Sequence, residues 1–600
     1  MRLLDLNDLG DTADCVTELC IIGSGPAGLA LAAEFAHGSV RVLVVESGGR
    51  EPEPEAAALN AVDSVGATRV EQQELMRTRA LGGTSRIWTG RCAELDDVDF
   101  AARAWVPHSG WPIGAADLRP YLDRARAYLG LGPNTYDETL WPVLGAPRPA
   151  PALDPTLLTP RFWQFSRGTR EPWGPARFAA DVVPTTAPNV DVLLHATATH
   201  IDTNAEGTAV EAVEVAAPGG RRTRIRAKAF ILATGGLENA RLLLASNRIW
   251  PAGVGNGHDL VGRFLMDHPG GVIASVPPAA ARRLRSRFGR YWLDGPAGRQ
   301  VYLHGLALSP DVQEKEGLLN CAAFLEEYPT ADDPWHAGQR LVAALKRQEP
   351  SPDQVELASF WRRDDDGGIA AAPSALRDAL AIARHAPSVA AGAYRIVRQH
   401  RPPVFRAGQV DLYCLTEQVP DPSSRLTLSD RADAFGVPLP RVDWKIGERE
   451  RESMRRLVEL LDGEFGRVGY PRPKPATWLG GGADWRDSLT DRAHPIGTTR
   501  MSATPRDGVV DRHGQVHGVA GLFVAGSSTF PTAGHANPTL TIVALAIRMA
   551  DRLKAECFSA SGSASGSSAP GSSAPGSSAP GSSAPGSSAP AGPAAAGLSG

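Results

Sequence analysis

The segment PTAGHANPTLTIVALAIRMADRL (residues 531–553) places two polar side chains, His535 and Asn537, directly before a long apolar run. An Asn followed by a Pro is typical of a helix start, with Asn as the N-cap and Pro at the first helical position. The pattern therefore predicts a helix over 538–553. A histidine can also accept a proton near neutral pH, and an amide can hydrogen-bond a substrate oxygen. Both residues are candidates for chemistry at this helix start.

A glycine motif near the N-terminus has the spacing of a dinucleotide site. Gly23, Gly25 and Gly28 separate an apolar strand from an Ala/Leu-rich helix. Gly23 permits a tight turn, Gly25 lets a pyrophosphate approach the backbone, and Gly28 lets the helix pack against the strand. The helix N-terminus supplies free N–H groups for phosphate. The next strand ends at Glu46, which can accept hydrogen bonds from an adenosine ribose. The motif does not choose between NAD and FAD.

Three further segments bear on the cofactor: RALGGTSRIWTGRC (79–92), ILATGGLENARLLLAS (231–246), and HPIGTTRM … GVVD … GLFVAGSSTFPTAGHANPTLT, which begins at His494. Together with the glycine motif they resemble the glucose–methanol–choline (GMC) oxidoreductases, with landmarks in order over about 13–555. These are FAD enzymes that oxidise alcohols. HANPTLT and GGTSRIW are most similar to pyranose oxidases and bacterial glycoside oxidases. The resemblance implies hydride transfer to flavin N5 from an alcohol group on a sugar, glycoside or related polyol.

The resemblance also implies which residues hold FAD. Ala198 would lie on the strand whose backbone meets adenine, and Thr539 would offer a backbone N–H to the flavin pyrimidine edge. The remaining expected contacts run along the flavin, pyrophosphate and ribityl chain: Gly82, Gly83, Thr84, Ser85, Gly526 and Ser527.

One departure from the family concerns covalent attachment. Pyranose oxidases with covalently bound flavin have a His one position before the Trp of the Gly-Gly loop. Here Ile87 occupies that position. Because an isoleucine cannot bond to the flavin methyl group, we expect FAD to be bound non-covalently.

The GMC pattern also assigns the catalytic roles. It has a His in H-x-x-G-T, followed about 40 residues later by a His or Asn that opens the last helix. Here these are His494 and Asn537. We expect His494 to be the base and Asn537 to hydrogen-bond the substrate oxygen; the alternative for Asn537 is a helix cap alone. His535 is an extra residue, expected to shape or pack the pocket, with direct substrate contact as a weaker alternative. The segment MDHP (266–269) is expected only to turn the chain.

The predicted fold is a two-domain α/β flavoprotein. A Rossmann-like FAD-binding domain would comprise 13–110, 190–270 and 490–555, and a sheet-and-helix substrate domain would comprise 111–189 and 271–489. The GSSAP repeats favour a disordered tail over 558–600, because Ser, Gly, Ala and Pro bury too little apolar surface to order it.

The composition limits the kinds of partner that this chain is expected to bind. The chain has 600 residues, 42% hydrophobic, with a net charge of −4. These values do not suggest binding to nucleic acid or an anionic membrane. Scattered cysteines and the absence of a recognisable export signal predict a cytoplasmic protein. The expected partners are a small alcohol or sugar substrate and an electron acceptor, either O₂ or an external one.

Three alternatives share the fold. A steroid or simple-alcohol oxidase would need an apolar pocket. A GMC-fold lyase would bind FAD without using its redox chemistry. The large subunit of a membrane-linked sugar dehydrogenase would be expected to carry an export signal.

Overall fold

The computed structural model describes most of the first 559 residues: 1–9, 14–66, 76–145, 148–169, 174–182, 186–295, 298–330, 332–346, 375–398, 403 and 407–559. Residues 1–558 form one compact unit. The tail predicted to be disordered, 558–600, lies outside the described residues except for its first two positions.

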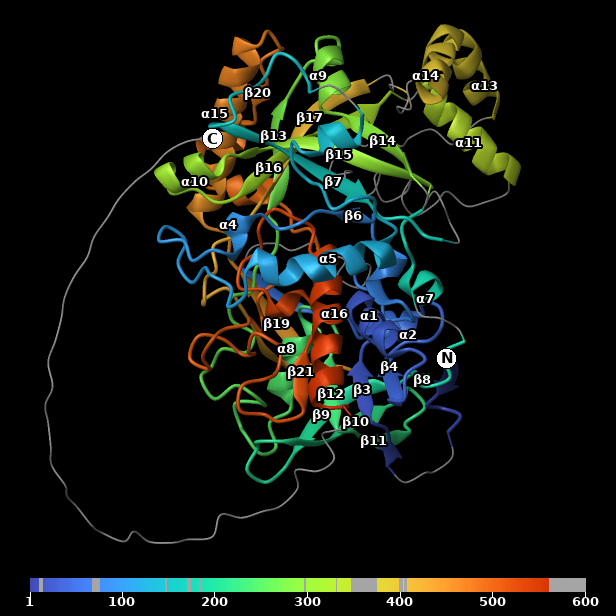
Figure 1. The fold of residues 1–600 in the computed structure, drawn as a ribbon, viewed down its shortest axis with the longest axis vertical. Helices are drawn as coiled ribbons and strands as arrows, with labels where there is room; N and C mark the ends of the chain where they lie inside the picture. The colour runs from blue at the N-terminus through green and yellow to red at the C-terminus, as the bar shows by residue number, and fades with distance from the viewer. Residues whose placement is uncertain are drawn as a thin grey trace, which may run out of the picture. The chain divides into compact units, whose positions relative to one another are not determined.

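A six-stranded parallel sheet forms the lower part of Figure 1. Its central strands are buried on both faces, as expected where helices cover both sides of a parallel sheet. The predicted strand, glycine turn and helix are confirmed at its centre. In order, the strands are β1 (Arg2–Asp5), β8 (Val190–Leu194), β4 (Val42–Val45), β3 (Leu19–Ile22), β12 (Ala229–Leu232) and β21 (Leu522–Val524).

Helices α1 (Pro26–Phe35) and α16 (Thr539–Glu556) pack against one another beside this sheet, and α5 (Ala115–Leu129) packs on α16. The apolar run that follows Asn537 therefore forms a buried helix, as predicted. It begins at Thr539 rather than at residue 538.

Residues 190–235 form mostly β-structure. Besides β8 and β12, they supply three antiparallel strands of a small second sheet that β2 (Cys15–Val16) joins in parallel. The three strands are β9 (Thr197–Thr203), β10 (Val210–Ala216) and β11 (Arg222–Arg226).

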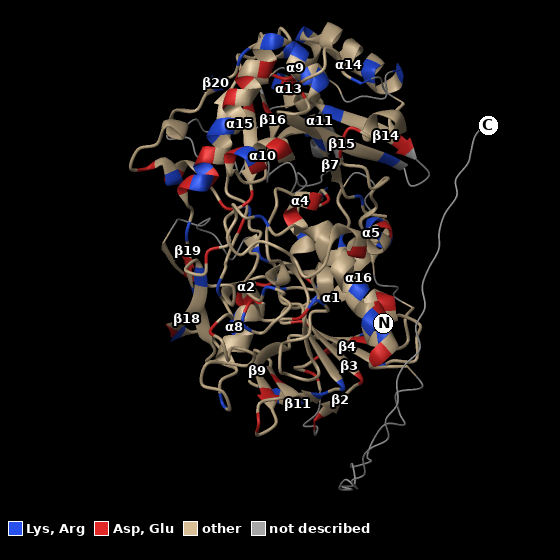
Figure 2. Cartoon of the chain, turned by 60° about the vertical axis from the view of Figure 1, so that its left-hand side comes forward, with Lys and Arg blue, Asp and Glu red and all other residues tan. Residues whose placement is uncertain are grey.

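A larger antiparallel sheet lies above the parallel one in Figure 1. Helix α15 (Glu448–Arg467) covers it and shows alternating acidic and basic residues on its outer face (Figure 2). The strand order is β20 (Lys474–Pro475), β13 (Gly270–Ser275), β17 (Ala407–Thr416), β16 (Cys321–Pro329), β15 (Gly298–Leu308), β7 (Leu158–Phe165) and β6 (Arg91–Cys92), with β14 (Arg290–Gly295) paired to β15.

The segment PDPSS (420–424) lies between two strands that do not pair with each other. β17 lies in the large sheet, whereas β18 (Arg425–Ala432) pairs with β19 (Pro438–Trp444), which pairs with β5 (Asp63–Gly66). The other helices are α2 (Pro54–Ala58), α4 (Asp97–Phe100), α6 (Leu140–Val143), α7 (Phe178–Asp181), α8 (Glu238–Ala245), α9 (Arg282–Arg287), α10 (Pro310–Glu316), α11 (Pro334–Lys346), α13 (Ala375–Arg384) and α14 (Ala386–Arg398).

Within the described part of the chain, no helix is both long and apolar enough to cross a bilayer.

Candidate active site

A cavity of about 370 Å³ opens where β3, β4, β12 and β21 end. The carboxyl edge of a parallel sheet is the usual ligand site of such folds. Most of the residues predicted to bind FAD or substrate line this cavity: Gly23, Gly25, Glu46, Gly83, Thr84, Ser85, Ala198, His494, Gly526, Ser527, Asn537 and Thr539.

Two predicted glycines do not line it, and both support the turn from behind. A Cβ at Gly28 would lie 2.0 Å from the Gly23 carbonyl oxygen, so only glycine allows α1 to approach the turn this closely. Gly82 has a φ of +99°, and its N–H donates to Ser24 Oγ at 3.3 Å.

The two glycine loops meet across the cavity wall. A Cβ at Gly83 would lie 2.8 Å from Gly25 Cα, whereas a Cβ at Gly25 itself would have nothing within 4 Å. Gly25 is the N-cap of α1, and it provides no side-chain hydrogen bond to the first turn. Bare backbone at a helix N-terminus is what a pyrophosphate needs.

Glu46 is buried and tied to the glycine turn. Its Oε2 accepts from Ser24 N at 3.1 Å and from Ser24 Oγ at 2.5 Å, and its Oε1 accepts from Gly48 N at 3.0 Å. Burial raises the pKa of the Glu46 carboxyl group, and these hydrogen bonds oppose that rise. The carboxylate is therefore fixed at the cavity edge, where a ribose hydroxyl could reach it.

The start of α16 differs from the prediction. The N-cap is Pro538, with φ −75° and ψ −14°, and it makes no side-chain cap. Asn537 is therefore one position too early to be the N-cap, and the prediction of that role is wrong. Asn537 Oδ1 is buried and has no hydrogen-bond partner among the described residues. Because Asn537 lines the cavity, its amide oxygen is left for a ligand.

The other candidate in the cavity wall, His494, is hydrogen-bonded to a second histidine. His268 Nδ1 lies 3.1 Å from His494 Nδ1, and His268 Nε2 lies 3.2 Å from the Ala533 carbonyl oxygen. A carbonyl can only accept, so His268 Nε2 carries a proton and its Nδ1, when neutral, can only accept. His494 Nδ1 must then be the donor. This leaves the lone pair of His494 on Nε2, free to receive a proton.

Electrostatics keep His494 neutral. Its pKa is lowered to about 3, chiefly by burial and then by His268, Arg492 and Arg91, while Asp267 opposes the shift. Burial also lowers the pKa of His268. Both rings are therefore neutral at physiological pH, as the hydrogen-bond assignment requires.

Asp267 fixes the backbone that carries His494. Its Oδ1 accepts from Arg492 N at 3.0 Å and its Oδ2 from His494 N at 2.9 Å. Between them, Ala493 has a φ of +55°, a left-handed conformation that costs a non-glycine residue about 1–3 kcal/mol. The MDHP segment is thus part of the site, and the expectation that it only turns the chain is wrong. In the sequence, the Asp-His pair within an apolar stretch was the signal that could have indicated this role.

His535 lies behind the wall. It is 1% exposed, does not line the cavity, and packs edge-on against Trp163 at 5.7 Å. Its Nδ1 is 3.7 Å from Asp96 Oδ2, and burial lowers its pKa to about 4. This position agrees with packing rather than with direct substrate contact.

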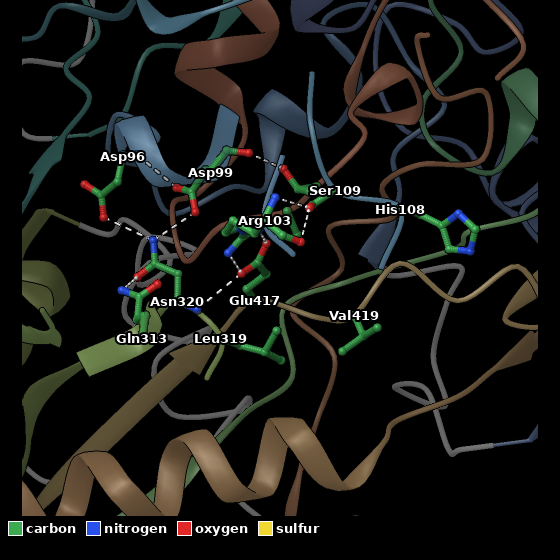
Figure 3. Close-up of polar contacts among 12 residues, drawn as sticks. Asp96, Asp99, Arg103, His108, Ser109, Gln313, Leu319, Asn320, Glu417 and Val419 are labelled. Atoms are coloured by element: carbon green, nitrogen blue, oxygen red, sulfur yellow. Dashed lines mark hydrogen bonds and ion pairs between the residues drawn. The ribbon is translucent and has the colours of Figure 1, made fainter. Parts of the chain in front are cut away.

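The buried network beside His535 anchors the loop that leads to α16 (Figure 3). Asn320 Nδ2 donates to Asp96 at 3.1 Å and to Asp99 at 2.9 Å, and Arg103 pairs with Glu417. Thr532 Oγ1 donates to the Asp99 carbonyl oxygen at 2.6 Å. The network therefore links the loop before Asn537 to Asn320 and Glu417, which flank β16 and β17 of the large sheet.

Two family models match separate parts of the chain. Residues 17–248 match the family model described as pyridine nucleotide-disulphide oxidoreductase, and residues 420–546 match the model described as GMC oxidoreductase. The C-terminal part of the chain thus carries a domain of the GMC oxidoreductases. The members of this family are FAD enzymes, and the exposed glycine backbone, the two helix N-termini and the orphaned amide of Asn537 fit that cofactor.

Two relatives and one solved structure illustrate the similarity. The fructose dehydrogenase large subunit of Gluconobacter japonicus is 27% identical, over 57% of this chain and 50% of its own length. The paromamine 6'-oxidase of Streptomyces fradiae is 25% identical, over 91% of this chain and 93% of its own. Formate oxidase shares the fold, with a TM-score of 0.52 and 18% identity over 91% of this chain and 99% of its own. The match to the fructose dehydrogenase subunit thus spans about half of that protein.

Proposed function

We propose that this GMC oxidoreductase oxidises an alcohol group of a sugar, glycoside or related polyol, with His494 as the base. The observation that carries the proposal is the lone pair on His494 Nε2, in the wall of the cavity that fits FAD. Alcohol oxidation removes a hydride from carbon and a proton from oxygen. Bound FAD would supply the hydride acceptor, and this chain must supply the proton acceptor.

His494 suits that role in geometry and in protonation state. Nε2 can take the hydroxyl proton while Nδ1–H remains hydrogen-bonded to His268. Asp267, whose charge raises the pKa of His494, stabilises the resulting imidazolium. A base held neutral at all pH values above about 3 needs no prior deprotonation.

Asn537 would hydrogen-bond the substrate oxygen that His494 deprotonates. Its side chain can donate through Nδ2 to the reacting oxygen and accept through Oδ1 from a neighbouring hydroxyl group. The start of α16 adds backbone N–H groups and a partial positive charge beside it. These groups would stabilise negative charge that develops on the cofactor side of the cavity.

The relatives' names support the substrate class, since fructose is a sugar and paromamine is an aminoglycoside. Ile87 lines the cavity in place of the linking histidine, which supports non-covalent FAD. We retain the division into an FAD domain and a substrate domain as a proposal. No disulfide joins any of the six cysteines, all of which are described, and this supports a reducing, cytoplasmic location. The acceptor is O₂ or an external one.

Anaerobic mixing with a panel of sugars, glycosides, aminoglycosides and sterols tests the proposal. We expect loss of the flavin absorbance band near 450 nm with at least one sugar or glycoside. Reduction by sterols alone would favour a steroid oxidase. A protein whose flavin no alcohol reduces would be a lyase or another non-redox member of the fold.

A further inference from the structure

The large sheet contributes a charged cluster to the cavity wall. Arg91 on β6, Glu326 on β16 and Arg492, two residues before His494, all line the cavity. Charge interactions link Arg91 to both Glu326 and Arg492, so the three side chains form one cluster. Their chemistry is not needed to remove a proton or to hold a pyrophosphate.

Arg91 is the member of this cluster whose charge is not matched. Its Nε is buried without a hydrogen-bond partner, and its guanidinium forms no ion pair of 4.0 Å or less with any described residue. Its contacts are with rings, at 4.4 Å from the Phe324 centroid and 5.8 Å from the Phe165 centroid. Burial lowers its pKa to about 10, which still leaves it cationic at neutral pH.

Other arginines of the cavity have partners. Arg77 and Arg79 both pair with Glu238, at 2.9 Å each. Arg492 Nη1 donates to Tyr413 Oη at 3.0 Å. Arg91 thus presents a planar fork of N–H donors to the cavity, and such a fork matches the two oxygens of a carboxylate.

Glu326 does not neutralise Arg91. The two charges attract and each favours the ionised form of the other, but no ion pair of 4.0 Å or less joins them among the described residues. Glu326 Oε2 accepts from Tyr328 Oη at 3.3 Å. Burial raises the pKa of Glu326 to about 7, so the carboxyl group is only partly ionised at neutral pH. Two guanidinium groups therefore face, at most, one negative charge, and this part of the wall is positive.

We propose that the alcohol substrate carries a carboxylate, as a sugar acid does, and that Arg91 binds this carboxylate while the reacting hydroxyl group faces His494. This inference rests on the proposed function and narrows its substrate class. An amino sugar would bring a third cation beside Arg91 and Arg492. A neutral sugar would leave the guanidinium without an ionic partner, and a buried unpaired charge is costly.

The test compares matched substrates in the holoenzyme. Glucuronate and galacturonate are each compared with their uncharged methyl esters and with glucosamine, by anaerobic stopped-flow reduction of the flavin. We expect the ratio of the reduction rate constant to the substrate Kd to be about 10–100-fold higher for an acid than for its ester, as for a hydrogen bond to a charged group. Arg91→Met should abolish that preference, so that the ratio of the value for the acid to the value for its ester falls to about one. Arg91→Lys should restore part of it.

Direct binding gives a readout that does not depend on turnover. Cyclohexanecarboxylate has a carboxylate but no hydroxyl group, so its Kd can be measured from the perturbation of the flavin spectrum. We expect its Kd to rise about 10-fold or more in Arg91→Met. Arg290→Met is the matched control, because Arg290 lies 5.2 Å from the same Phe165 ring but does not line the cavity.

The outcomes separate the two proposals. Faster reduction by an ester or by glucosamine than by the acids, with ratios unchanged in Arg91→Met, would overturn the carboxylate inference and leave alcohol oxidation intact. Loss of FAD from Arg91→Met would place Arg91 against the cofactor and would also overturn it. Failure of every sugar and glycoside to reduce the flavin would overturn the proposed function itself.

Discussion

His268 Nδ1 lies 3.1 Å from His494 Nδ1, and the Ala533 carbonyl oxygen on the far side of His268 fixes which of the two rings donates. The carbonyl fixes the proton on His268 Nε2, so the shared proton belongs to His494. As a result, the lone pair of His494 is on Nε2, the ring nitrogen that is not hydrogen-bonded to His268. The carbonyl belongs to the loop that leads to α16, which couples the base to the position of Asn537.

His494→Ala should lower the rate constant of flavin reduction by about 10²–10⁴, the usual contribution of general acid–base catalysis. FAD content should stay near that of the wild type, because the adenosine and pyrophosphate sites lie elsewhere in the cavity. His535→Ala is the matched control, since His535 is buried behind the wall. If His535→Ala abolished reduction and His494→Ala did not, the base would be misassigned.

His268→Leu should slow flavin reduction by about 10-fold, because His494 Nδ1–H loses its acceptor and the proton can move to Nε2. His268→Asn should recover much of the rate, since its Oδ1 can accept the same hydrogen bond. A purely structural role would not move the tautomer, so ¹⁵N NMR of labelled histidine is the deciding measurement. An unchanged Nδ1–H signal for His494 in His268→Leu would refute the positioning role.

The sequence predicted the cofactor half of the molecule well, because G-x-G-x-x-G spacing, apolar strands and Ala-rich helices are local signals. Glu46 and Gly25 could be placed from spacing alone. His268 and Arg91 could not, because they reach the cavity through strand pairing and turns between residues far apart in sequence. The prediction that Asn537 is the N-cap was wrong for a local reason: Pro538 has helical dihedral angles but is itself the N-cap, so Asn537 falls outside the helix.

Asn537→Ala should slow flavin reduction by about 3–10-fold, the value of one neutral hydrogen bond to the substrate oxygen. Because Asn537 does not cap α16, Tm should change little, in contrast to the loss of about 1 kcal/mol that a missing cap would cause. Stopped-flow reduction and thermal unfolding of the same preparation measure both quantities. A large fall in Tm with normal reduction would assign Asn537 a structural role instead.

Acid precipitation should release FAD into the supernatant, because Ile87 cannot form the bond that a histidine forms at this position. The measurement is the absorbance spectrum of the supernatant and of the redissolved pellet. A yellow pellet would show covalent attachment through some other residue. Ile87→His, after incubation with FAD, tests whether the position alone permits attachment.

The affinity for a sugar acid should fall as the pH rises through about 7. The pKa of Glu326 is raised to about 7, chiefly by burial and also by the charge of Asp411 on β17. The charges of Arg91 and Arg492 and the hydrogen bond from Tyr328 oppose this rise. Below pH 7 the carboxyl group is largely neutral and does not oppose a bound carboxylate. Above pH 7 it is ionised beside Arg91 and competes with the substrate for the same guanidinium.

We expect the Kd of glucuronate to rise about 3–10-fold between pH 6 and pH 8, by roughly 1 kcal/mol of added repulsion. The Kd of its methyl ester should stay nearly constant over this range, because His494 remains neutral throughout. Glu326→Gln should flatten the profile for the acid and leave the ester unchanged. A profile for glucuronate that keeps its slope in Glu326→Gln would assign the titration to another group.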